Sequence, residues 1–176
     1  AHKGGRLLET EIIGFPGHAS QTQAGVNAIS IAGECIVFLN SKANAFKTDG
    51  TRDERMEPPY NTINIGTIEG GTANNIIAGN CRFSWGCRSI TEVDLDDLVK
   101  QFSDHCNNEI LPSHKEINSD VKITTKEAHG LPPLMQDSDN PIEAIMRQLT
   151  GQNQTKGVAF GTEAGLFSEA GIPSVV

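Results

Sequence analysis

The stretch GFPGHAS, residues 14–20, carries a single histidine in a loop just ahead of an apolar-periodic run. An imidazole can donate a hydrogen bond or transfer a proton near neutral pH, so His18 is a candidate catalytic residue. A histidine in a loop can equally be an ordinary surface residue. No neighbouring metal ligand or base in the sequence separates the two interpretations.

Two more polar side chains flank a predicted strand. Asn75 follows the pair Gly70–Gly71, where an asparagine often satisfies the backbone groups of a turn. Arg88 lies near the end of an alternating run and faces away from its apolar residues, which are Cys81, Phe83, Trp85 and Cys87. A guanidinium on that face can bind a carboxylate through two hydrogen bonds, or it can simply be solvated.

A third candidate lies in FGTEAGLF, residues 160–167, where Gly161 and Thr162 connect a predicted strand to a predicted helix. The free N–H groups at the start of a helix can bind an anionic group. An ordinary strand-to-helix turn, with Thr162 as the N-cap of the helix, explains the same residues.

The histidines and cysteines do not form a metal-binding motif. The sequence contains no H-x-D, no H-E-x-x-H and no His/Cys pair at ligand spacing. It also lacks a G-x-S-x-G elbow and a P-loop. We therefore expect no metal ion to be bound by this chain alone, and any metal centre has to be completed by other sequence.

Hydrophobic periodicity predicts the elements that must position these residues. We expect strands at 5–14, 60–68, 75–89 and 119–128, and helices at 24–39 and from Thr91 to Pro112. Thr91 and Asp94 form a capping pair at the start of the second helix. The polar segment 40–59 is predicted to be a loop, and Gly70–Gly71 a hairpin turn with positive φ. The resulting order, β-α-β-β-α-β, is the ferredoxin-like α+β pattern: a four-stranded antiparallel sheet with two helices on one face.

The composition changes at 129–141, which indicates a domain crossing. Beyond it we expect a helix from Pro141, a short buried strand at 156–160 and a short helix at 163–170. This order suggests part of an α/β domain. The closing residues, GIPSVV, resemble the start of a buried strand, so we expect the chain to be a fragment of a longer protein.

Charge and composition exclude several classes of partner. Apolar residues make up 37% of the 176 residues and the formal net charge is −8. Without a basic cluster, nucleic acid and anionic membranes are poor partners, and no apolar run approaches the roughly 18 residues of a membrane span. The four cysteines show no C-x-x-C spacing, which indicates reduced core thiols in a cytoplasmic protein.

Taken together, the segments GHASQTQAGVNAI, NTINIGTIEGGTANNIIAGNCRFSWGCR and FGTEAGLFSEAGIPSVV resemble, in order, signatures of one enzyme family. It is the acetylornithine deacetylase and succinyl-diaminopimelate desuccinylase family of dinuclear-zinc amidohydrolases and exopeptidases. The forms GTEAG and IEGGTANNII are most similar to the acetylornithine deacetylase branch. The sequence departs from the family pattern at Ala78, Ala19, Gln21 and Cys87, none of which is a proposed functional side chain.

The resemblance implies an architecture and a set of roles. Residues 3–128 would form a ferredoxin-like lid and dimerisation domain, and residues 131–176 part of the catalytic domain. The ligands of two zinc ions and the general-base glutamate would lie outside this chain. His18 would reach the partner subunit's active site and donate a hydrogen bond to the oxyanion. Asn75 and Arg88 would bind substrate, with Arg88 on its α-carboxylate, and Gly161 and Thr162 would form a substrate-contacting turn.

The implied function is hydrolysis of the N-acyl amide of an amino acid by a cytoplasmic homodimer, with N-acetylornithine, an intermediate of arginine biosynthesis, as the first candidate substrate. Desuccinylase, aminoacylase and dipeptidase activities of the same family are alternatives. A ferredoxin-like dimerisation module without hydrolytic function remains a third possibility.

Overall fold

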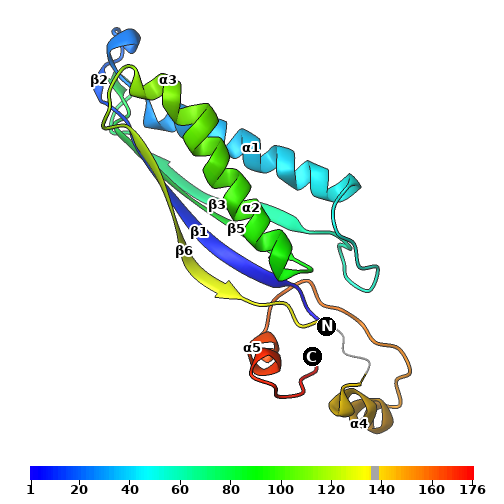
Figure 1. Cartoon of the computed structure of the whole chain (residues 1–176). Coiled ribbons are helices and arrows are strands. Elements are labelled where there is room, and N and C mark those ends of the chain that lie inside the picture. Colours follow the sequence, from blue (N-terminus) through cyan, green and yellow to red (C-terminus); the bar gives the residue numbers. More distant parts are fainter. Residues whose placement is uncertain (136–138) are drawn as a thin grey trace.

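A computed structural model describes residues 1–135 and 139–176. Four long strands form one antiparallel sheet in the order β3-β5-β1-β6: β1 (Gly4–Ile13), β3 (Thr62–Gly70), β5 (Asn80–Ser89) and β6 (Lys122–Leu131). Helices α1 (Ala28–Thr48) and α2 (Glu92–His105) cover one face of this sheet (Figure 1). The fold is therefore α+β with the ferredoxin-like order, as the periodicity predicts.

Side-chain alternation decides which face of the sheet each residue occupies. In β1, the buried residues Leu8, Thr10 and Ile12 face the helices. In β5, the buried positions are every second residue, which leaves Arg82, Ser84 and Arg88 on the open face. The pattern in β5 confirms the predicted alternation, and both patterns arise because a strand buried on one face alternates with a period of two.

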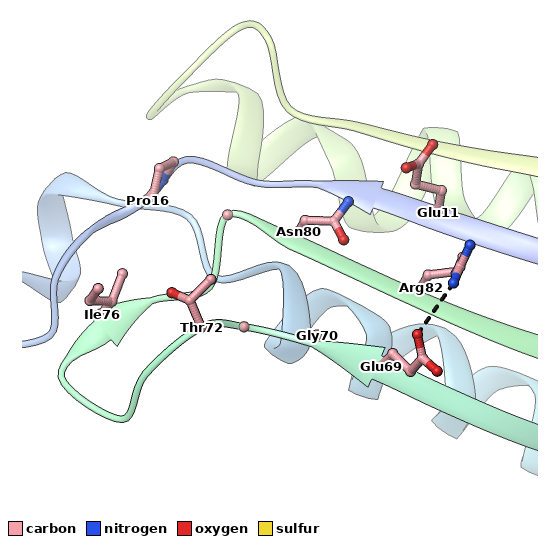
Figure 2. A pocket seen from close by; sticks show the side chains of 10 residues that line it. Glu11, Pro16, Glu69, Gly70, Thr72, Ile76, Asn80 and Arg82 are labelled. Carbon is pink, nitrogen blue, oxygen red and sulfur yellow. Dashed lines mark hydrogen bonds and ion pairs between the residues drawn. The ribbon is translucent and has the colours of Figure 1, made fainter.

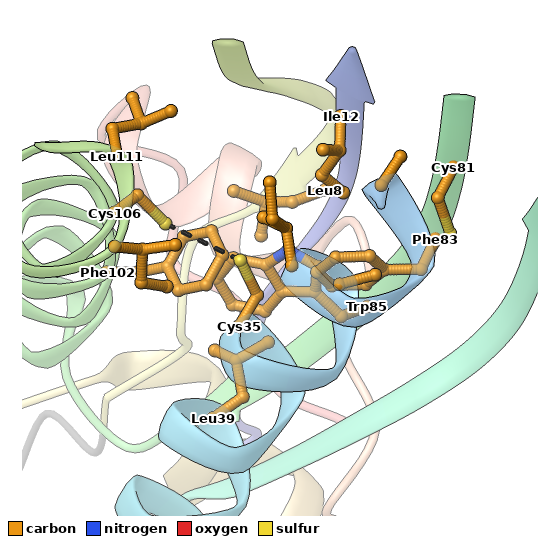
Figure 3. Packing of buried hydrophobic residues seen from close by; sticks show 14 of the residues in the cluster. Leu8, Ile12, Cys35, Leu39, Cys81, Phe83, Trp85, Phe102, Cys106 and Leu111 are labelled. Carbon is orange, nitrogen blue, oxygen red and sulfur yellow. Dashed lines mark hydrogen bonds between the residues drawn. The ribbon is translucent and has the colours of Figure 1, made fainter. Parts of the chain in front are cut away.

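The core lies between the sheet and the helices (Figure 3). Trp85 is fully buried and packs edge-on against Phe102 of α2, with ring centroids 5.1 Å apart. The indole N–H donates to the hydroxyl of Thr10, 3.0 Å away, which also contacts the hydroxyl of Thr125 on β6. A buried indole needs such a partner, because an unpaired polar group in the core is costly.

Side-chain caps fix where both covering helices begin. Asn27 accepts hydrogen bonds from the backbone N–H groups of Ile29 and Ser30 at the start of α1. Thr91 accepts one from the N–H of Asp94 at the start of α2, which confirms the predicted capping pair.

The prediction that residues 40–59 form a loop is wrong for its first part, because α1 continues to Thr48. The polar residues there form the solvent face of the last turns of the helix. Phe46 still packs against the core, and Lys42 lies over the ring of Phe38 at 5.2 Å. One apolar residue per turn was enough to hold this helix on the sheet.

Pro112 does not end the second helix. A π-helical turn (Cys106–Ile110) follows α2 and leads directly into α3 (Leu111–Lys115). Pro112 occupies the first turn of α3, where its missing N–H costs little.

The predicted strand 75–89 is broken into two. A short strand β4 (Ile76–Ile77) precedes β5 and pairs with another short strand, β2 (Gly17–His18), which a 3-10 turn (Thr22–Ala24) follows. Gly71 has the expected positive φ of 72°, but Gly70 is the last residue of β3. The connection is therefore a loop that leaves the main sheet, and not a tight hairpin.

The C-terminal segment contains α4 (Pro141–Thr150) and α5 (Ala164–Glu169), both close to their predicted positions. The strands predicted at 156–160 and in the closing residues are wrong. Val158 makes only one parallel bridge, to His2. The backbone N–H and C=O of Val158 bond to Ala1 and Lys3, but no ladder continues from this bridge among the described residues, so the segment does not form a strand. The predicted crossing at 129–141 includes residues 136–138, which lie outside the described residues.

All four cysteines are free and buried. The sulfur atoms of Cys35 and Cys106 are 3.9 Å apart. Burial raises the pKa of the Cys87 thiol to about 11. Within the described residues, no helix combines the length and apolarity needed to cross a membrane.

Replacing Thr10 by valine should lower the free energy of unfolding by about 1–3 kcal/mol, because the Trp85 N–H would lose its buried acceptor while the shape is kept. Urea denaturation measures this change. Thr124→Val is the matched control, since Thr124 is exposed on the same sheet. Equal unfolding midpoints for the two variants would contradict the structural role of this hydrogen bond.

Candidate functional site

His18 and Asn75 lie side by side at one end of the sheet. The ladder between β2 and β4 pairs His18 with Ile76, next to Asn75 in the chain. The backbone N–H of Ala19 donates to the carbonyl oxygen of Asn75 at 2.9 Å. Both side chains are exposed. The structure thus joins two predicted site residues that are 57 positions apart in the sequence.

The orientation of His18 is fixed through one ring nitrogen. The backbone N–H of Ser20 donates to Nδ1 at 3.2 Å, and the Ser20 hydroxyl lies 2.7 Å from the same atom. A nitrogen that accepts from a backbone N–H carries no proton in the neutral ring, so the proton is on Nε2. Nε2–H is therefore available to donate a hydrogen bond to a ligand.

A cleft of about 620 Å³ lies on the open face beside this loop end (Figure 2). Pro16, Thr72 and Ile76 form its outer side. Glu69 and Arg82 line its inner side and form an ion pair at 3.2 Å. The guanidinium of Arg82 is thus already partnered within the chain.

Arg88 is positioned near the opposite end of β5, on the open face of the sheet. Its side chain lies over Gly5 of β1, the residue paired with it in the ladder. A Cβ atom at Gly5 would lie 2.0 Å from the Nη1 atom of Arg88. The absence of a side chain at Gly5 is what lets the guanidinium cross β1.

Arg88 is also the one arginine that makes no ion pair or hydrogen bond in the described chain. Arg6, by contrast, bonds to Glu92 and Asp96. Burial lowers the pKa of Arg6, but these hydrogen bonds outweigh burial and raise it. An unpaired guanidinium beside a hollow is a ready site for a carboxylate.

The hollow next to Arg88 measures about 330 Å³. Backbone of three glycines forms part of its lining: Gly5, Gly66 and Gly86. Its size suits a small molecule, for which pockets of roughly 300 Å³ and more are usual.

Gly161 and Thr162 lie at the same end of the sheet as Arg88. A Cβ atom at Gly161 would lie 3.3 Å from the carbonyl oxygen of Lys3 and 3.4 Å from Leu131, which pairs with Gly5. The N-cap residue of α5 is Glu163, but the hydroxyl of Thr162 accepts from the N–H of Ala164 at 3.2 Å. Thr162 therefore caps the start of α5, as expected for an ordinary turn that leads into a helix, although it lies one residue before the N-cap position.

The five predicted residues therefore form two groups at opposite ends of the sheet. His18 and Asn75 lie beyond Asn80, and Arg88 lies near the other end of β5. Eight residues of extended strand span roughly 27 Å. The two groups cannot contact one small molecule within one protomer.

Among residues 1–135 and 139–176, no group of three or more histidine, cysteine or acidic side chains could hold a metal ion. Within these residues, the candidate site therefore consists of binding and hydrogen-bonding groups.

Sequence reasoning overlooked the residues that support the two groups. The spacing H-x-S could have indicated Ser20 as the partner of His18, since serine often bonds to groups two residues away. The role of Gly5 has no local signal, because it depends on the strand opposite. Asn64 and His129 also line the hollow and were overlooked for the same reason.

Comparisons with known proteins place the chain in a family and identify several relatives. Residues 1–114 match the family model described as the M20 peptidase dimerisation domain. The chain is 29% identical over its whole length to an acetylornithine deacetylase of Myxococcus xanthus, of which it covers 44%. It is 31% identical to an acetylornithine deacetylase of Proteus mirabilis, again over its whole length, and covers 43% of that protein.

Among solved structures, a tripeptidase from Staphylococcus aureus superposes on 98% of the chain with a TM-score of 0.60 and 22% identity. The chain covers 42% of that protein. At this identity the likeness concerns the fold. The chain thus spans less than half the length of the relatives that it matches.

Proposed function

Because the chain belongs to the family of the M20 peptidase dimerisation domain, we propose that it is part of a metal-dependent amidohydrolase that cleaves the N-acyl group from an amino acid. N-acetylornithine is the proposed substrate. The curated relatives that match the chain end to end, at about 30% identity, are named acetylornithine deacetylases. The observation that carries the proposal is the unpaired Arg88 beside a small hollow, far from the hydrogen-bond donor His18.

We assign residues 3–128 to a lid and dimerisation domain and residues 131–176 to part of a catalytic domain. The second assignment is supported by apolar side chains that α4 and α5 leave exposed. Leu149 of α4 is 74% exposed and Phe167 of α5 is 51% exposed. Such faces normally pack against other structure, here the rest of the proposed catalytic domain.

Members of this family dimerise through this domain, and the free edge of β3 is the surface that best suits a second copy. β3 carries one charged residue, Glu69, and its exposed Ile68 is apolar. The other edge strand, β6, carries Lys122, Lys126 and Glu127, which discourage pairing. Two β3 edges related by a twofold axis would pair antiparallel. In such a pair, the end of the sheet that carries His18 and Asn75 in one protomer would lie next to the end that carries Arg88 in its partner.

This geometry supports a division of roles between subunits. Arg88 binds the α-carboxylate of the substrate held by its own subunit, with Gly161 and Thr162 in the same group. His18 of the other subunit donates its Nε2–H to the oxygen of the amide carbonyl as charge develops there. Asn75 assists from the same loop. A donor aimed at developing charge contributes several kcal/mol to catalysis in a site without water.

Family members are metallohydrolases, and we propose two zinc ions for the whole enzyme. Zinc would supply a Lewis acid and an activated water. The described residues hold no ligand cluster for it, so its ligands belong to other sequence of the whole protein. The role of this chain is to bind the substrate, orient it and stabilise the oxyanion. Four free cysteines are compatible with the reducing cytoplasm.

The full-length protein should hydrolyse N-acetylornithine with a higher kcat/KM than N-succinyl-diaminopimelate, other N-acetyl amino acids or a dipeptide. Release of the free amine from each compound measures this preference. A different preferred substrate would move the enzyme to the desuccinylase, aminoacylase or dipeptidase branch. A metal-loaded protein that hydrolyses none of them would favour the dimerisation module without catalysis.

Mixing two impaired variants, His18→Ala and Arg88→Ala, should restore activity if the two residues serve one site from different subunits. His18→Ala should lower kcat about 100-fold and Arg88→Ala should mainly raise KM. Each mixed dimer contains one intact site, so random exchange should recover about a quarter of the wild-type kcat/KM. A mixture no more active than its components would show that both residues act from the same subunit. His114→Ala is the control and should leave kcat/KM unchanged, because His114 lies in α3, on the helical side of the sheet.

Ile68→Lys should shift the protein from dimer to monomer, because a charged side chain on the free edge of β3 disfavours strand pairing. Sedimentation equilibrium measures the change. Thr124→Lys, on the other edge strand, should leave the dimer intact. If Thr124→Lys dissociates the dimer and Ile68→Lys does not, the partner binds β6.

A further inference from the structure

Among the side chains that line the hollow beside Arg88, His129 of β6 and Asn64 of β3 are polar and make no hydrogen bond or ion pair in the described chain. Both are exposed on the open face of the sheet. Neither side chain stabilises the fold through a hydrogen bond or an ion pair. Three unpartnered polar side chains around one hollow suggest a common ligand.

The register explains how these residues meet. Asn64, Gly86, Leu7 and His129 form one row across the four strands. Arg88 and Gly5 belong to the next row. Since the guanidinium lies over Gly5, it is one strand and one row away from His129. Diagonal neighbours of this kind are roughly 7–8 Å apart at the backbone, which long side chains can bridge through a small ligand.

The charges around the hollow favour an anion. No acidic residue is among the described residues that line it. Glu127, two residues from His129, lies 3.5 Å from Arg6 on the helical side. Glu9, in the row beyond Leu7, lies 3.7 Å from Arg82. Arg88 is therefore not neutralised, and a carboxylate in the hollow would meet a full positive charge and additional N–H donors.

We propose that His129 is a second anion-binding residue that shares the substrate carboxylate with Arg88. The guanidinium binds one side of the carboxylate, and an N–H of the His129 imidazole donates to the other. Asn64 completes the rim from β3 and leaves room for the substrate chain above Gly86. His129 thereby makes the site specific for substrates with a free α-carboxylate. This inference rests on the role proposed for Arg88.

Binding of a small probe to this chain tests the inference without hydrolysis. N-acetylglycine carries the amide and the carboxylate, and N-acetylglycinamide lacks the charge. NMR titration of the ¹⁵N-labelled chain should show shifts of the side-chain signals of Arg88 and His129 with N-acetylglycine only. His129→Ala should weaken binding about three- to tenfold and Arg88→Ala more than tenfold. Relative to the unmodified chain, the double variant should lose less affinity than the product of the two single losses, since both residues hold one group.

Two further variants separate binding from folding. His129→Gln keeps an N–H donor and should retain affinity within about twofold. Thr124→Ala, on the same face of β6 but outside the hollow, should bind as the unmodified chain does. If His129→Ala binds N-acetylglycine as tightly as Thr124→Ala does, while Arg88→Ala does not, the inference is wrong and Arg88 acts alone. Absence of binding to the unmodified chain would also overturn it. If the full-length protein lacks hydrolytic activity but His129→Ala weakens binding, the amidohydrolase proposal fails and the carboxylate site stands.

Discussion

The packing of α1 and α2 on one face of the sheet decides which residues of the long strands face outward. Because the helices bury Leu8, Phe83 and Trp85, the alternate positions of the same strands must face outward. Arg88 is one of these outward positions, and a shift of the register by one residue would bury it. The apolar core therefore orients polar groups that it never touches. The hydrogen bond from Trp85 to Thr10 ties the two central strands together at the level of the core.

The distance along β5 between the two groups of candidate residues is the second constraint on the site. A ten-residue strand is long compared with a substrate, so its two ends cannot serve one active site in one protomer. An extended domain with a free, nearly uncharged edge at β3 offers a physical solution, since twofold pairing brings opposite ends together. Dimerisation would then be a requirement for catalysis rather than only a source of stability.

Arg82 and Arg88 both lie on the open face of the sheet, but their surroundings differ. Arg82 forms ion pairs with Glu9 and Glu69, whereas Arg88 extends across Gly5 and finds no partner. The difference depends on which residues the neighbouring strands present at each row. Because the guanidinium of Arg88 has no partner among the described residues, it remains free to bind an anionic group.

The sequence by itself determined the order of the four long strands and two covering helices, the buried face of β5 and the capping pair at Thr91, because these depend on local periodicity and on neighbours a few residues apart. Motifs that resemble one family also singled out His18, Asn75 and Arg88 as candidates. The tertiary structure decided that α1 continues to Thr48, that the segment at Val158 is not a strand, and that the candidate residues form two distant groups. These features depend on contacts between segments far apart in the chain. Gly5 makes room for the side chain of Arg88 only because β5 pairs with β1 at this position. No local sequence pattern contains that information.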